Sequence, residues 1–231
     1  MLTAVRIPRG TFASIVTERL RASIIDGTLK PGAQLNEVEL ATSFGVSGGP
    51  VREALQRLVQ EGLLDSEPHR GVFVPVLTEE DIWDIYLVRE ALESAAIRAI
   101  IANGTAPAAA ASLDQHVTLM EKAEAVGDWK AVGNFDLEFH VALVDASGSP
   151  RLRRMFGTVI SETRLCLAVL TTADVREDLV HEHRRICDLM LAGETEQALA
   201  VLAKALQRRR GHASHRQVEL TDHKVRSEVL W

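Results

Sequence analysis

The sequence predicts a mainly helical protein with two domains. The first, residues 1–76, is predicted to be a winged helix-turn-helix of three helices and a β-hairpin, and the second, residues 77–231, an all-α bundle. Three observations lead to this prediction. A helix, a glycine turn and a second helix fit the stretch between Asn36 and Leu64, two β-rich runs follow them directly, and six helical segments with short breaks fill the rest of the chain.

The composition is that of a globular protein. With 231 residues, 46% hydrophobic and 25% charged, the chain can bury one large or two modest cores. The formal net charge is −6, but residues 1–76 contain eight Lys and Arg and eight Asp and Glu, so the acidic excess lies in the second domain. A neutral first domain can still gather a few arginines on one face, so the acidic balance does not exclude binding to nucleic acid.

The helix pair begins at Asn36, whose side chain can accept hydrogen bonds from the first free N–H groups of a helix. Glu39 follows three residues later, as in a capping box. Gly45 supplies the backbone freedom of a sharp turn, and Ser47 is expected to cap the second helix. The apolar residues of both helices recur at helical spacing and are expected to face inward: Val38, Leu40, Ala41, Phe44, Val51, Leu55, Leu58 and Val59.

The outer face of the second helix is expected to be exposed and available to bind a partner. Gly48, Arg52 and Gln56 lie one above another on it, with Gly49 beside them. A helix-turn-helix presents its second helix to DNA in this way.

A hairpin follows the helix pair. The runs 63–66 and 72–76 are rich in β-forming residues and flank a basic tip that contains Arg70 and Gly71. A glycine-joined helix pair alone is common among helical proteins, and the hairpin favours the DNA-binding alternative.

The second domain is helical by its start and stop signals. Thr78 with Asp81 is expected to cap the first helix, and Asn103-Gly104 to end it. Further helices are predicted to begin at the following residues: Pro107, Asp128, Pro150, Ala173 and Thr195. Arg208 to Arg210 are expected on a solvated face, and the polar tail beyond about residue 211 is expected to fray.

Three residues of the bundle have the chemistry of a metal site. Asp136 and His140 are four residues apart and therefore project from one helix face, and His183 on a later helix could supply a third ligand. The alternative is an Asp–His pair on the surface with an unrelated histidine.

Residues 12–76 resemble the winged-helix domain of the GntR superfamily of bacterial transcription regulators. The resemblance rests on the runs Asp26 to Gly32, Leu35 to Glu37 with Glu39 to Ala41, and Pro50 to Leu55. It implies a double-stranded DNA operator, contacted by Ser47 and Arg52 of the recognition helix and by Arg70 and Gly71 of the wing. The family usually has Arg-Thr where this chain has Gly48-Gly49, so a main base-reading side chain is missing.

Residues 78 to about 210 resemble the FCD effector domain of the FadR-like branch of that superfamily. The matching runs are Val88 to Glu93, Asp136 to His140, Ser147-Gly148 and Glu182 to Arg184. The resemblance implies a homodimer and a zinc or nickel-like metal held by Asp136, His140 and His183. The fourth ligand is expected at residue 205, which is Ala205 here, so the ligand set is incomplete.

The same resemblance makes Arg89 an effector-binding residue, suited to a small organic acid, with acyl-coenzyme A as the other option. The alternative role for Arg89 is an intrahelical pair with Glu93.

The sequence thus predicts an effector-controlled transcription regulator and not an enzyme. Two cysteines, no secretion signal and no membrane-length apolar run indicate a cytoplasmic protein. Two alternatives stay open. One is a metal-dependent hydrolytic enzyme built on the bundle, and the other is a DNA-binding protein with an inert dimerisation bundle.

Overall fold

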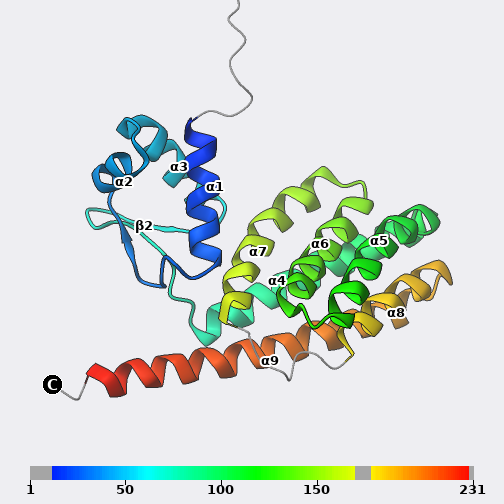
Figure 1. Ribbon diagram of the computed structural model, residues 1–231. Helices are drawn as coiled ribbons and strands as arrows, with labels where there is room; N and C mark the ends of the chain where they lie inside the picture. Colours follow the sequence, from blue (N-terminus) through cyan, green and yellow to red (C-terminus); the bar gives the residue numbers. More distant parts are fainter. Residues whose placement is uncertain (1–11, 170–177, 229–231) are drawn as a thin grey trace, which may run out of the picture. The chain divides into compact units, whose positions relative to one another are not determined.

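The computed structural model describes residues 12–169 and 178–228, with residues 167–169 and 212–228 described by their backbone only (Figure 1). The chain divides into two compact units, Met1–Val76 and Leu77–Trp231. The mainly helical class, with a winged helix-turn-helix followed by a helical bundle, is confirmed. No helix in the described ranges has the length and apolar character to cross a membrane.

The first unit contains three helices and a small sheet. The helices are α1 (Phe12–Ile25), α2 (Glu37–Phe44) and α3 (Gly48–Gln60), and the strands are β1 (Gln34–Leu35), β2 (Asp65–Glu67) and β3 (Gly71–Phe73). Helix α1 packs against α3, and β3 lies between β1 and β2 with antiparallel pairing on both sides. The hairpin is therefore anchored by a third strand, β1, which the sequence analysis did not predict.

The turn between α2 and α3 is built as its residues predict. The Asn36 side chain accepts hydrogen bonds from the backbone N–H of Val38 and of Glu39, and Gly45 adopts the left-handed conformation at φ 65°. Ser47 stands at the N-cap of α3, but its side chain makes no capping hydrogen bond, so that expectation is wrong.

Two further expectations for this unit need correction. Val38 is 74% exposed because it lies on the solvent side of the short helix α2, opposite the half-buried Leu40 and Phe44. The wing strands are also shorter than predicted. Leu63 and Leu64 are buried core residues before β2, so the apolar run that predicted a strand serves packing instead.

The second unit contains six helices in its described part. They are α4 (Glu79–Ala102), α5 (Ala106–Ala125), α6 (Trp129–Ala146), α7 (Pro150–Val169), α8 (Leu179–Leu191) and α9 (Thr195–Glu228). Thr78 and Asp81 form the predicted capping box. Helix α4 packs against α6, α7 and α9, and α9 runs alongside it in Figure 1.

The C-terminal part of the bundle differs from the prediction in one respect. The tail beyond residue 211, which was expected to fray, is assigned to helix α9 as far as Glu228. Residues 212–228 include no proline and no glycine, so nothing in their sequence breaks a helix. The predicted helix start at Ala173 lies outside the described residues.

Candidate functional site

A cluster of buried charged and polar side chains lies inside the second unit. Helix α6 contributes Asp136 and His140, α8 contributes His183, and each is almost completely buried. The structure thus brings the three predicted metal ligands together, and the alternative of a surface Asp–His pair is wrong. One ligand atom from each lies within 4.8 Å of the others.

The two histidines of the cluster have defined orientations. His140 Nδ1 lies 2.5 Å from Glu93 Oε2, and His183 Nδ1 lies 2.7 Å from the carbonyl oxygen of Leu179. Because a carboxylate and a carbonyl can only accept, each Nδ1 carries the proton and donates it. The two Nε2 atoms face Asp136 Oδ1, at 3.7 Å from His140 and 3.0 Å from His183.

A fourth side chain, Arg209 of α9, completes the cluster. Its Nη1 lies 3.0 Å from His140 Nε2, its Nη2 lies 2.9 Å from Asp136 Oδ1, and the residue is only 4% exposed. The expectation that Arg208 to Arg210 form one solvated face is therefore wrong.

Helical periodicity explains this correction, because three consecutive residues of a helix point in three directions. Arg208 pairs with Glu182, and the Arg210 guanidinium lies 3.3 Å from the centroid of the Trp83 ring. Arg209 points inward, four residues after the buried Ala205 and on the same helix face. That spacing is the sequence signal that would have identified it.

The charges in the cluster determine its protonation. Burial would raise the pKa of Asp136, but the charge of Arg209 and contacts with His140 and His183 hold it well below the usual range. Burial would likewise raise the pKa of Glu93, which His140 and Arg89 lower. Burial lowers the pKa of His183. Both carboxylates are therefore charged and His183 is neutral near pH 7.

Arg89 lies at the edge of this cluster on α4. Its Nε donates to Glu93 Oε1 at 3.0 Å, so the predicted alternative, an intrahelical pair, is formed in the interior. Its guanidinium also lies 5.3 Å from the ring centroid of Tyr86, one turn earlier. Within the described part of the chain, Arg89 Nη2 and the Tyr86 hydroxyl are buried without a hydrogen-bond partner. Such unpaired donors are costly and mark a place where a ligand can bind.

The three predicted ligands have the chemistry of a zinc or nickel site, since two imidazole nitrogens and a carboxylate converge. Ala205, the predicted fourth position, is buried but offers no ligand atom. His140 Nε2 already accepts a hydrogen bond from Arg209. A metal and Arg209 in this position therefore exclude each other.

The recognition-helix residues lie on the surface of the first unit. Ser47, Gly49, Arg52 and Gln56 are exposed, as predicted for residues that contact DNA, and Gly48 is partly buried. Arg52 is bound by Glu37 of α2 through a bidentate pair, with Nε at 3.0 Å and Nη2 at 2.7 Å from the carboxylate oxygens. Glu37 was absent from the predicted site.

Gly48 is the reason that Glu37 can take this place. A Cβ atom at residue 48 would lie 2.8 Å from Glu37 Oε1. Glu37 therefore fills the space at the start of α3 that any side chain at residue 48 would need.

The wing residues are exposed at the turn between β2 and β3. Arg70 pairs with Glu67, and its guanidinium lies 5.6 Å from the ring centroid of Phe73. Gly71 has φ 107°, a conformation that favours glycine, and the Gln34 side chain donates to the carbonyl oxygen of Arg70. Strand β1 thus helps to fix the wing tip.

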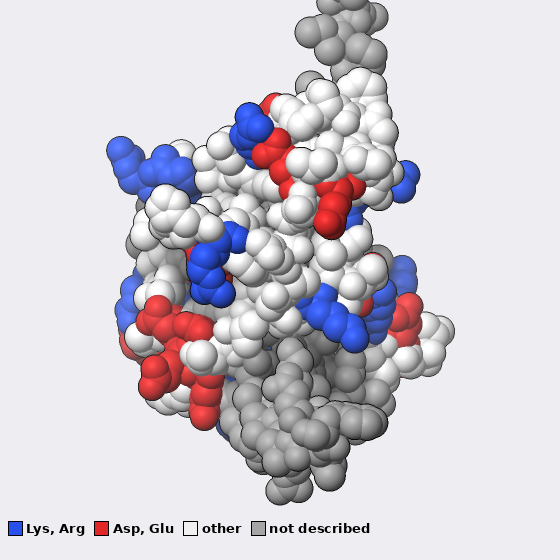
Figure 2. Space-filling model, turned by 90° about the vertical axis from the view of Figure 1, so that its left-hand side faces the viewer, with Lys and Arg blue, Asp and Glu red and all other residues white. Residues whose placement is uncertain are grey.

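The surface does not carry one large basic patch on the side shown in Figure 2. Lys and Arg atoms are separated there by acidic and uncharged side chains. DNA binding on that side would depend on individual arginines and not on a general basic surface.

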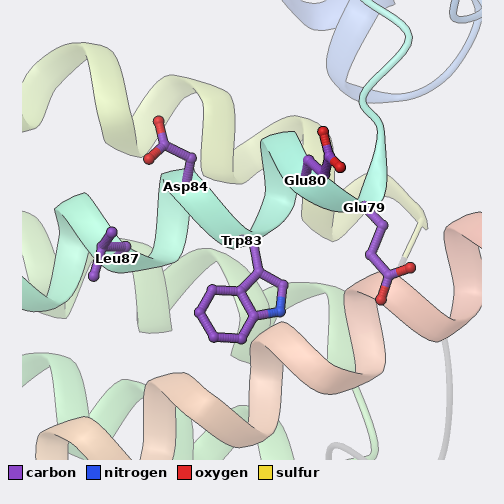
Figure 3. A pocket seen from close by; sticks show the side chains of 5 residues that line it. All are labelled: Glu79, Glu80, Trp83, Asp84 and Leu87. Carbon is purple, nitrogen blue, oxygen red and sulfur yellow. The ribbon is translucent and has the colours of Figure 1, made fainter.

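A separate pocket of about 320 Å³ lies on the outer face of α4 (Figure 3). Trp83 and Leu87 line it together with Glu79, Glu80 and Asp84, and Trp83 is 49% exposed and points toward α9. Its acidic lining makes it unsuited to an organic acid.

Comparison with known proteins agrees with this architecture. A family model described as bacterial regulatory proteins, gntR family, matches residues 12–74, and a model described as the FCD domain matches residues 84–208. The chain is 33% identical over 196 residues to the probable D-xylose utilization operon transcriptional repressor of Paenarthrobacter nicotinovorans, which covers 85% of this chain and 86% of that protein.

Two further relatives support the same assignment. The HTH-type transcriptional regulator YdhC of Bacillus subtilis (strain 168) is 33% identical over 178 residues, which is 73% of this chain and 75% of that protein. The solved structure of E. coli McbR/YncC is 27% identical with a TM-score of 0.74, covering 89% of this chain and 98% of that one. The chain therefore belongs to the GntR family of DNA-binding bacterial transcription regulators, in the group whose second domain is an FCD domain.

Proposed function

We propose that this regulator changes its affinity for a double-stranded DNA operator when a small organic acid binds inside the helical bundle. The observation that carries the proposal is the pair of buried, unpartnered donors, Arg89 Nη2 and the Tyr86 hydroxyl, next to a charged cluster. A carboxylate supplies two acceptor oxygens and would satisfy both donors at once.

The site favours an acid over other small molecules because of its donors. Arg209 Nη2 is paired with Asp136 Oδ1 at 2.9 Å, so the two buried donors of the described residues that an acid could satisfy are those of Arg89 and Tyr86 on α4. Acyl-coenzyme A stays in the test as the alternative effector, although no contact in the bundle favours it.

The mechanism we propose is a two-state homodimer. Two recognition helices of a dimer read two half-sites, and the acid alters the packing of the bundles and thereby the spacing of those helices. The acid must bind the DNA-bound and free states with different affinities, since otherwise it would shift nothing. Such a protein acts in the cytoplasm and needs no catalytic activity.

The effector proposal is tested with a variant that should keep the stability of the bundle but lose affinity for the acid. Tyr86→Phe removes only the unpartnered hydroxyl, so the stability of the bundle is expected to stay unchanged or to rise. The same change should weaken acid binding by about 5- to 10-fold, because one hydrogen bond to a charged carboxylate is lost.

The measurements are acid-induced thermal shifts and operator titrations with a panel of organic acids and acyl thioesters. Arg98→Ala serves as the control, because Arg98 pairs with Glu196 on the surface and does not touch the cluster. A panel without any effect on operator affinity would contradict the effector proposal. It would favour the inert-bundle alternative.

A second prediction concerns operator specificity. Gly48→Arg is expected to add a preference for guanine at one position of each half-site, because a bidentate arginine discriminates by about 1–3 kcal/mol. The new side chain can be accommodated if the flexible Glu37 carboxylate moves.

Selection of bound DNA from a random pool, run in parallel for the wild type and the variant, measures this change. Gly49→Thr is the matched control and should not introduce the guanine preference. Identical consensus sequences for the wild type and Gly48→Arg would count against residue 48 as a base-reading position.

A further inference from the structure

We propose that the Arg209 guanidinium is the permanent cation of the buried cluster and keeps divalent metals out of the wild-type protein. It touches two of the three predicted metal ligands, at 2.9 Å from Asp136 Oδ1 and 3.0 Å from His140 Nε2. The residues of this chain themselves therefore disfavour a bound metal at this position.

The first argument is the lone pair of His140. Glu93 fixes the proton of this imidazole on Nδ1, which leaves a single lone pair on Nε2. That lone pair accepts the hydrogen bond from Arg209 Nη1. A metal would need the same lone pair, so one cation must leave before the other can bind.

The second argument is charge balance. The buried charged residues of the cluster are two carboxylates, Asp136 and Glu93, and two guanidiniums, Arg89 and Arg209. The cluster is therefore neutral as it stands. A divalent metal added to it would leave two uncompensated positive charges in the interior, whereas a carboxylate would add one negative charge beside the unpaired donors of Arg89 and Tyr86.

The third argument is the geometry of α9. Long side chains on a helix lean toward its N-terminus, so Arg209 reaches back over the turn that begins at Ala205. Ala205 is buried and small, and it leaves this space to the guanidinium. The absence of a fourth ligand at Ala205 is therefore what makes room for the buried guanidinium of Arg209.

This arrangement also deepens the proposed function, on which the following step rests. A carboxylate effector would meet a guanidinium where a metal would otherwise supply the positive charge. Its effect on operator binding should therefore be insensitive to chelators.

The test uses the full-length protein purified without chelator. Elemental analysis, calorimetric titration with Zn²⁺ and Ni²⁺, and thermal unfolding are compared for wild type, Arg209→Met, and Arg210→Met as the matched control. Arg210 neighbours Arg209 but stacks on Trp83. We expect no bound metal in the wild type and in Arg210→Met. We expect Arg209→Met to bind Ni²⁺ at least about 100-fold more tightly and to be stabilised by it.

A second variant, Ala205→His with Arg209→Met, supplies a fourth ligand and should bind more tightly still. If Arg209→Met folds only when Ni²⁺ is present, that rescue supports the proposal. One equivalent of metal in the wild type, or a folded Arg209→Met without gained affinity, would overturn it. None of these measurements involves DNA or an acid, so failure of the effector proposal would be recognised separately.

Discussion

Replacing Arg52 with alanine is expected to abolish operator binding. Arg52 is an exposed cation near the start of α3, with 64% of its side chain accessible, and Gly48 one turn earlier contributes no side chain to the DNA. Recognition therefore depends on Arg52 more than it would in a helix with an arginine at residue 48. The folded structure should persist, because an exposed pair such as Arg52–Glu37 contributes little to stability. A gel-shift titration on the selected operator measures the loss.

Glu37→Gln is the matched control for this prediction. It removes the carboxylate that binds Arg52 but leaves the guanidinium in place, so operator affinity should be kept or increased. It also separates the loss of Arg52 from the loss of the pair. Unchanged operator affinity in Arg52→Ala would show that this residue does not contact the DNA.

Asp136→Asn is expected to destabilise the bundle by about 3–5 kcal/mol, the usual effect of breaking a buried ion pair. Asp136 is 2% exposed and lies against His183 and Arg209. The amide would leave the guanidinium as an uncompensated buried charge. Denaturant titration monitored by tryptophan fluorescence reports this unit alone, because Trp83, Trp129 and Trp231 all lie beyond residue 76.

The control for this change lies on the same helix. Asp145 of α6 pairs with Arg153 at the surface, so Asp145→Asn should have little effect. Combining Asp136→Asn with Arg209→Met restores neutrality and should recover part of the lost stability, which a double-mutant cycle measures. Equal stability of Asp136→Asn and the wild type would mean that the cluster carries no net charge interaction.

The elements set by local sequence were predictable. Asn36, Gly45 and the Thr78–Asp81 capping box each define a helix end through contacts within a few residues, so their positions follow from the chain itself. The gathering of Asp136, His140 and His183 was also expected, although their role as metal ligands is still a prediction.

The features that escaped prediction depend on partners far apart in the sequence. Strand β1 is two residues long and pairs with β3 across almost forty residues, so no periodicity marks it. Arg209 contacts His140, which is sixty-nine residues earlier in the sequence. Because Arg208 and Arg210 flank it, the sequence pattern predicts that all three arginines are exposed. The role of Glu37 depends on Gly48, whose lack of a side chain has meaning only once α2 and α3 are packed.

A cation that is part of the polypeptide arrives with every molecule at synthesis and in a fixed ratio. A sensor domain that takes its cation from solution responds to metal supply as well as to its ligand, whereas Arg209 is bonded to α9 and cannot be removed by metal scarcity. With Arg209 as its cation, this regulator would keep the same operating range in metal-rich and metal-starved cells. It would answer to one chemical signal only.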